Sequence, residues 1–288
     1  MKYDIVLFSD NLQNEFVESV TKTHNIKAII SSKKNSKLHL IKNDELEIEV
    51  YNPTKSYDFE MSICILFLFE KIIDVNKIKS SGIFNFHYGL LPEWRGNSCN
   101  VWSLVNGVNF IGYSFHEVNN EIDDGDILYK YKIELPGEQT YFKVRESIIE
   151  HSIKEAPKII SKIGLSKSIY NPPKFINYTP RAKYSDTIID SFNIEVGLFN
   201  GMFKAFSGSD WGFNVKSRLG LMKILSIKIF NSKNNVNGFI GRVVNLIEID
   251  DRKFTVVKVL NGYVYIGEVL IENEICDLYK LVKIGTQL

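Results

Sequence analysis

Short apolar runs alternate with helix-like segments in the N-terminal half of the chain, and this alternation restricts the fold more than any other feature. The runs at 5–8, 26–30 and 62–69 have the length and composition of buried strands. Between the first two runs, apolar residues at 12–20 recur at helical spacing. Strands joined by helical or irregular connections predict an α/β protein with a doubly wound parallel sheet.

Further elements of this first region follow from the same patterns. Gly82 and the alternation of apolar residues with Asn85 and His87 predict a strand that enters a loop. We also expect a short helix at 97–106, strands at 112–118 and 127–133, and a long helix over 141–163.

The C-terminal region has a different pattern. Two adjacent prolines within 170–174 mark a boundary, because proline cannot continue a helix. Asn261-Gly262, between two apolar runs, predicts a hairpin. After one more helix at 187–206, strands are expected at 221–230, 239–249, 254–259 and 262–266. We therefore expect two domains, a catalytic domain at 1–185, and a C-terminal helix with a small antiparallel, OB-like β-domain at 186–288.

Composition excludes several classes of protein. The 288 residues carry a net charge of +1, which gives no reason to expect nucleic acid as an obligatory partner. The three cysteines are widely spaced and are expected to be reduced thiols, with neither a disulfide framework nor a metal site. The N-terminal apolar stretch is too short for a signal peptide, and no apolar run approaches the ~18 residues of a membrane helix. We therefore expect a cytoplasmic protein that does not contact a membrane.

An amide, an imidazole and a carboxylate come from three nearby places in the chain. Period-two alternation places Asn85 and His87 on the same strand face, and Asp123 follows in the turn-forming segment 122–126. Acyl transfer to an amine passes through an oxyanion, for which an amide is a fixed donor, and an imidazole can transfer protons near neutral pH. A nearby carboxylate would orient the imidazole and favour its charged form.

Two gapped strings carry a specific family resemblance. N-x-H-x-x-L-L-P-x-x-R-G begins at Asn85, and H-x-x-x-x-x-I-D-x-G-D runs from His116 to Asp126. Together they resemble the 10-formyltetrahydrofolate-dependent formyltransferases, which include methionyl-tRNA formyltransferase, glycinamide ribonucleotide transformylase and nucleotide-sugar N-formyltransferases. The match is close over 62–133 and looser elsewhere. It implies a Rossmann-like catalytic domain and 10-formyltetrahydrofolate as formyl donor.

The resemblance also implies roles for particular residues. Its catalytic Asn, His and Asp correspond to Asn85, His87 and Asp123. Without the two strings, Asn85 would read as a turn cap and His87 as a loop histidine, while Asp124, Asp126 and His116 are equally or better explained as structural. The implied cofactor-binding residues are Phe69, Ile72, Leu91, Asn119, Glu121 and Asp123, and the implied substrate-binding residues are Tyr88, Trp94, Arg95 and Asn97. Phe69 and Ile72 could equally be an ordinary buried strand end.

The sequence says less about the acceptor amine than about the formyl donor. Asn119 and Glu121 replace the Asp and Gly common in the initiator-tRNA enzymes, and Tyr88-Gly89 replaces a small polar residue before L-L-P. The basic segment 31–37 lies where those enzymes carry a longer insertion, and is better explained as a solvated loop. We expect a small-molecule nucleotide-linked amino sugar as acceptor, in polysaccharide biosynthesis, with a homodimer left open. The alternatives are methionyl-tRNA, another small amine, or a binding module without activity.

Overall fold

The computed structural model describes residues 2–10, 14–33, 47–165, 176–230 and 238–288. It forms two compact units, the first comprising 1–99, 112–132 and 146–180, and the second comprising 100–111, 133–145 and 181–288. Most of the basic segment 31–37 and the paired prolines lie outside the described residues. The expected division of the chain at residue 185 remains a prediction.

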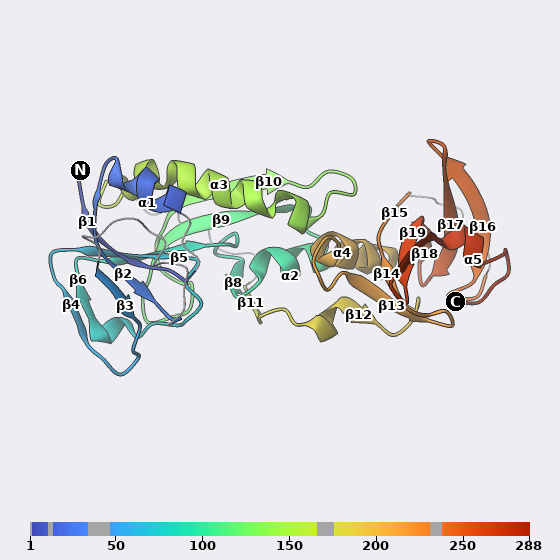
Figure 1. Cartoon of the computed structure of the whole chain (residues 1–288), viewed down its shortest axis with the longest axis horizontal. Coiled ribbons are helices and arrows are strands. Elements are labelled where there is room, and N and C mark those ends of the chain that lie inside the picture. The colour runs from blue at the N-terminus through green and yellow to red at the C-terminus, as the bar shows by residue number, and fades with distance from the viewer. Residues whose placement is uncertain (1, 11–13, 34–46, 166–175, 231–237) are drawn as a thin grey trace. The chain divides into compact units, whose positions relative to one another are not determined.

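A seven-stranded sheet with the order β10-β9-β7-β5-β1-β2-β3 organises the first unit (Figure 1). Its strands are β1 (Asp4–Phe8), β2 (Asn25–Ser31), β3 (Glu47–Val50), β5 (Ile63–Phe67), β7 (Ile83–His87), β9 (Phe110–Glu117) and β10 (Ile127–Glu134). The five strands from β7 to β3 are parallel, and β9 is antiparallel to β7. The expectation of an α/β fold with a parallel-rich sheet is confirmed. The strand order reverses between β1 and β5, where ligands commonly bind in such sheets.

Two helices, α1 (Asn14–Thr21) and α3 (Tyr141–Ile160), cover one face of this sheet (Figure 1). The ring of Phe16 on α1 lies 4.0 Å from that of Phe67 and 6.1 Å from that of Phe86, between centroids. Ser19 joins the two helices by donating to the Ile153 carbonyl at 2.9 Å. The apolar residues of β5 and β7 that alternate with the site residues are therefore buried against these helices. The short α2 (Cys99–Val105) follows the site loop.

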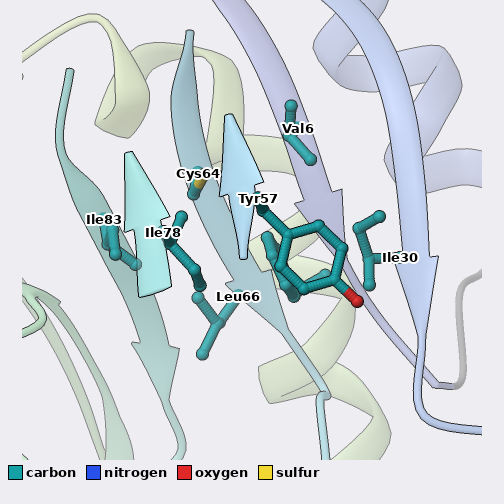
Figure 2. Packing of buried hydrophobic residues seen from close by; sticks show 8 residues of the cluster. Val6, Ile30, Tyr57, Cys64, Leu66, Ile78 and Ile83 are labelled. Carbon is teal, nitrogen blue, oxygen red and sulfur yellow. The ribbon is translucent and has the colours of Figure 1, made fainter. Parts of the chain in front are cut away.

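The opposite face carries a compact apolar cluster (Figure 2). Val6 of β1, Cys64 of β5 and Ile83 of β7 lie on it. A parallel pair of short strands, β4 (Tyr57–Phe59) and β6 (Ile78–Ser80), covers the cluster with the side chains of Tyr57 and Ile78. The 3-10 turn Val75–Lys77 precedes β6, and β8 (Trp94–Gly96) pairs with β11 (Asn177–Thr179). Asn85 and His87 follow Ile83 at period two, so they extend this face beyond its apolar part.

The second unit contains two small sheets and α4 (Val196–Phe206). One has the order β12-β13-β14-β19-β20 and the other β15-β18-β17-β16. Their strands are β12 (Ile188–Ile189), β13 (Phe213–Ser217), β14 (Gly220–Ile224), β15 (Ile227–Lys228), β16 (Val243–Ile249), β17 (Arg252–Val259), β18 (Gly262–Ile266), β19 (Glu268–Ile271) and β20 (Glu274–Asp277). All their pairings are antiparallel except that of β12 with β13. The 3-10 turn Tyr184–Thr187 precedes them, and the short helix α5 (Leu278–Leu281) follows.

Three expected boundaries in this unit are wrong. The strand expected at 239–249 begins only at Val243, because a turn precedes it in which the Arg242 N–H donates to the Phe239 carbonyl at 3.0 Å. The helix expected at 187–206 begins only at Val196, because β12 pairs with β13 and Phe192 is buried at 1% exposure in the segment between them. The strand expected at 221–230 breaks where Leu225 and Ser226 both donate to the Glu268 carbonyl. The hairpin signal at 261–262 is confirmed by the antiparallel pairing of β17 with β18. The antiparallel strands are present, and their OB-like arrangement remains a prediction.

Candidate active site

β7 and β9 together present a row of polar side chains on one face of the sheet. In their antiparallel register Asn85 lies opposite His116, and His87 lies opposite Ser114. Residues directly opposite one another share a face, so these four side chains are neighbours. His87, Ser114 and His116 are buried, and Asn85 is half-buried. The expected shared face of Asn85 and His87 thus has two further polar members on β9.

A tight turn after β9 brings Asp123 to this row. Its φ of 51° lies in the left-handed region, which Asp tolerates better than most residues. A Cβ at Gly125 would lie 1.9 Å from the Glu117 carbonyl oxygen, so only glycine fits there. This close approach explains the Gly of the I-D-x-G-D string. It holds the turn against the end of β9, and Asp123 is thereby directed at the histidines.

The Asp123 carboxylate lies between two imidazoles. Its Oδ2 is 3.5 Å from Nδ1 of His87, and its Oδ1 is 3.5 Å from Nε2 of His116. Oδ2 also accepts a hydrogen bond from the Gly96 backbone N–H at 2.8 Å. Burial raises the pKa of Asp123, but the hydrogen bond with His116, the charges of both histidines and the Gly96 N–H outweigh it and lower the pKa to about 2. Asp123 is therefore an anion at neutral pH.

The two ring nitrogens of His87 face different groups. Nε2–H donates to the Trp94 carbonyl at 2.9 Å, so Nδ1 is the nitrogen that faces Asp123. Burial lowers the pKa of His87, whereas the hydrogen bond to the Cys99 thiol and the Asp123 carboxylate raise it. The net effect is a pKa above the ordinary value, so a proton on Nδ1 is held more tightly than in a free imidazole.

His116 belongs to the same network, although the sequence favoured a purely structural role. Its Nδ1–H donates to the Glu117 carbonyl at 2.7 Å. Its Nε2 lies 3.3 Å from Nδ2 of Asn85 and 3.5 Å from Oδ1 of Asp123. An unprotonated Nε2 accepts from Asn85, whereas a protonated one donates to Asp123. The signal available in the sequence was its place as first residue of the second string.

The loop between β7 and β8 is fixed against His87. Ser114 accepts from the Leu91 N–H at 3.0 Å and donates to the Gly89 carbonyl at 2.9 Å. A Cβ at Gly89 would lie 2.5 Å from Nε2 of His87 and would displace the ring. Leu91, within this loop, is fully buried. The glycine before L-L-P is thus required by the close approach of the loop to the imidazole.

Three expected substrate-binding residues lie at the end of this loop. Trp94 is buried and contributes its carbonyl to His87. Arg95 is buried at 7% exposure, forms an ion pair with Asp124 and donates to the Tyr178 hydroxyl at 3.1 Å. Asn97 is exposed. The guanidinium of Arg95 therefore braces the Asp123 turn, and substrate binding by these residues remains a prediction.

Tyr88 points away from the polar row. Its hydroxyl lies 2.7 Å from Oγ of Ser152 on α3, and its ring packs edge-on against Phe67. Phe67 belongs to the sheet face covered by α1, so Tyr88 lies on the face opposite His87. This placement does not support the expected contact of Tyr88 with a substrate.

The expected cofactor-binding residues are spread over the loops of the site face. Phe69, half-buried, packs edge-on against Phe8 and Tyr51 at centroid distances of 5.6 and 5.5 Å. It therefore borders the apolar cluster on the same face as Asn85. Ile72 is 79% exposed, and Asn119 and Glu121 are also exposed. The roles of these residues in cofactor binding remain predictions.

Asp10 is a buried carboxylate that the sequence patterns did not indicate. It lies at the end of β1, next to the point where the strand order reverses. It accepts from the Ser32 N–H and Oγ at 2.6 and 2.8 Å, from the Ser31 hydroxyl at 3.1 Å and from the Glu70 N–H at 2.7 Å. Asp10 thus ties together the carboxyl ends of β1, β2 and β5.

Comparison with known proteins places this geometry in a family. Residues 5–160, more than half of the chain, match the formyl transferase family model. The chain belongs to the formyl transferase family. This family assignment confirms the resemblance carried by the two strings.

Individual relatives are more distant. The chain is 28% identical to methionyl-tRNA formyltransferase of Prochlorococcus marinus over 71% of its length, an alignment that spans 58% of that relative. Two solved folds are similar over nearly their whole length. The N-formyltransferase from Helicobacter canadensis, in complex with folinic acid and dTDP-3-aminofucose, has a TM-score of 0.68 and 18% identity, covering 92% of this chain and 98% of that one. The sugar 3N-formyl transferase WlaRD, with dTDP and 5-N-formyl-THF, has a TM-score of 0.69 and 17% identity, covering 95% and 99%. At these identities, the likeness shows the fold.

Among the residues that the structure describes, no group of His, Cys, Asp and Glu side chains could hold a metal ion. Within the same residues, no helix is long and apolar enough to cross a membrane.

Proposed function

We propose that this protein is an N-formyltransferase that moves a formyl group from 10-formyltetrahydrofolate to the amine of a nucleotide-linked amino sugar. The observation that carries the proposal is the convergence of Asn85, His87 and Asp123 on one sheet face. Together they supply the three groups that formyl transfer to an amine requires. These are a hydrogen-bond donor to the oxyanion, a group that accepts and returns a proton, and a carboxylate that stabilises the protonated form of that group.

Asn85 is the proposed hydrogen-bond donor to the oxyanion of the tetrahedral intermediate. A carboxamide nitrogen has two N–H groups, and one of them is directed at Nε2 of His116 at 3.3 Å. The second N–H is available for a substrate oxygen, because Asn85 is only half-buried.

His87 and Asp123 are the proposed proton-handling pair. Nε2 of His87 is occupied by the Trp94 carbonyl, so the ring can exchange a proton with a substrate only from Nδ1. The 3.5 Å separation between Nδ1 and Oδ2 exceeds an ordinary hydrogen bond and places the labile proton beside an anion. The attacking amine must lose a proton, which the neutral ring of His87 can accept on Nδ1. The Asp123 carboxylate would stabilise the imidazolium that forms, and the proton can then pass to N10 of the departing tetrahydrofolate.

Phe69 fits a donor with a flat, apolar ring. It is half-buried and borders the apolar cluster on the site face, whereas Leu91 is fully buried and would support the loop beside His87 from within. The folate would supply the formyl carbon, and Phe69 would contact its ring. The switch in strand order between β1 and β5 lies on the same sheet, where ligands of such folds commonly bind.

A sugar acceptor is favoured by the extent of the structural likeness. The two formyltransferase folds, one in complex with dTDP-3-aminofucose and the other with dTDP, cover at least 92% of this chain and at least 98% of their own length. The net charge of +1 also argues against a protein that must neutralise many phosphates. Methionyl-tRNA remains the second candidate because most of the sequence relatives are tRNA enzymes, such as that of Prochlorococcus marinus. Another small amine is the third.

The deciding experiment offers both acceptors to the purified full chain. With 10-formyltetrahydrofolate present, we expect mass spectrometry to detect a formamido sugar from a dTDP-linked amino sugar and no formylation of methionyl-tRNA. Initiator tRNA should not bind detectably at physiological salt. A tRNA enzyme would rely on contacts with several phosphates, and this chain has a net charge of only +1 with which to make them. Formylation of methionyl-tRNA with no sugar product would replace this proposal with the second candidate. The cytoplasmic location, the role in polysaccharide biosynthesis and the OB-like C-terminal domain belong to the same proposal.

A further inference from the structure

The second unit contains a cavity with a buried lysine in its wall. The cavity measures about 450 Å³, and its lining includes Lys204 and Asn200 of α4, Asn109 and Phe110 at the start of β9, and Leu135 after β10. All of its lining residues belong to the second unit, and none belongs to the site around His87. A volume at the lower end of the usual range for ligand pockets suits a molecule the size of a monosaccharide.

Lys204 occupies an unusual electrostatic position. Its side chain is 4% exposed, and its ammonium donates to Oδ1 of Asn109 at 3.0 Å and to the Leu135 carbonyl at 3.2 Å. Among the described residues, no carboxylate lies within ion-pairing distance of it, and burial lowers its pKa. A buried cation without a counter-ion is costly, and an ammonium has a third N–H to donate. An anion in the cavity would supply both the missing charge and an acceptor.

The rest of the lining restricts the other end of such a ligand. Glu134, Glu138 and the amides of Asn109 and Asn200 offer acceptors, which suit hydroxyl groups. The two carboxylates would repel a second anionic group, so a ligand with one oxyanion is favoured over a polyanion. Phe110 and Leu135 supply an apolar surface for a carbon skeleton.

The cavity wall is held independently of any ligand. The Leu135 N–H donates to the Asn109 carbonyl at 2.9 Å, which fixes the two segments that bind the ammonium. Asn200 and Lys204 are four residues apart on α4, so both face the same side of the helix. The oxyanion subsite is therefore preformed.

We propose that this cavity is a second ligand site, which binds a hydroxylated, sugar-sized metabolite through a single phosphate or carboxylate placed on Lys204. This inference does not rest on the proposed formyl transfer, and it is tested by binding alone.

The test is calorimetric titration of the full chain with three probes that share a hexose skeleton and differ at C6: glucose 6-phosphate, glucuronate and glucose. At least one of the two anionic probes should bind saturably, with a Kd of about 1 mM or tighter, and glucose about tenfold more weakly or not at all. Binding of the phosphate ester alone would assign the site to phosphorylated ligands, and binding of glucuronate alone to carboxylates. Saturation should also raise the pKa of Lys204, followed by NMR, because an adjacent anion favours the charged amine.

Two variants and a control make the test specific. Lys204→Met should weaken binding at least about tenfold, as expected for a lost charge-assisted hydrogen bond. Lys143→Met, which removes an exposed lysine on α3 of the same unit, should bind like the wild type. If Lys204→Met does not fold, Asn200→Phe, which narrows the cavity and keeps the lysine, decides in its place. The proposal is overturned if neither anion binds, if glucose binds equally well, or if the folded variant binds like the wild type.

Discussion

Oδ2 of Asp123 lies 3.5 Å from Nδ1 of His87, and each group alters the ionisation of the other. The pKa of the carboxyl falls to about 2, and that of the imidazole rises above its ordinary value despite burial. Each charged form is thus stabilised by the other group. Five predictions test this arrangement and the fold that supports it.

Replacing Asp123 with Asn should lower the pKa of His87, because the buried ring loses the carboxylate that favours its charged form. NMR titration of the histidine resonances measures the midpoint directly. Asp126→Asn is the matched control, since Asp126 belongs to the same turn but is exposed. An equal midpoint for wild type and Asp123→Asn would show that the two residues are not coupled.

The same pair should make stability depend on pH with a predictable sign. A carboxyl whose pKa falls from about 3.9 to about 2 stabilises the fold by about 2 kcal/mol above its unfolded pKa, and this is lost as the pH falls towards 2. The raised pKa of His87 acts oppositely, because its stabilisation is present below about pH 6.5 and is lost as the pH rises through the folded pKa. The free energies of unfolding of wild type and Asp123→Asn, measured with urea, should therefore become equal as the pH falls towards 2. A difference that does not change with pH would contradict the assignment.

Replacing His87 with Gln should lower kcat by about 10²–10⁴, the range for loss of a general acid–base group. The KM for the folate should change little, because the ring is almost fully buried and its Nε2 donates to the Trp94 carbonyl. Steady-state kinetics with a saturating acceptor gives both constants. His151→Gln, on α3 outside the site, is the control, and near-wild-type turnover in folded His87→Gln would remove His87 from the mechanism.

Asn85→Ala should lower kcat by about 10²–10³, as observed when one oxyanion donor is lost. Asn85→Asp should be at least as slow, because it places a second carboxylate against an oxyanion instead of an N–H. Both variants are measured in the same transfer assay. Retention of activity in Asn85→Asp would mean that position 85 donates nothing to the transition state.

Asp10→Asn should lower the free energy of unfolding by roughly 1–3 kcal/mol, since several donors lose an ionised acceptor in a buried position. Chemical denaturation gives the value. Asp58→Asn is the control: Asp58 is an exposed carboxylate whose ion pair with Lys79, at 4.0 Å, should contribute less than about 1 kcal/mol. Equal effects of the two substitutions would show that Asp10 does not hold the strand ends together.

Local sequence determined the strands and the faces of their side chains. The period-two pattern at 82–87 was enough to place Asn85 and His87 on one face, and β7 has that geometry. Helices α1, α2 and α3 also lie where apolar spacing predicted them. These features depend on residues only a few positions apart, which is the range over which hydrophobic periodicity is informative.

Only the tertiary structure decided which side chains meet. His116 joins Asn85 because β9 pairs antiparallel with β7 in one register, and a slip of one residue would direct it to the other face. The contact of Tyr88 with Ser152, the burial of Arg95 against Asp124 and the late start of α4 likewise depend on segments distant in sequence. At these positions, strand pairing and burial against distant segments outweigh the local conformational preferences of the residues. A local sequence pattern does not indicate which distant residue a side chain will contact.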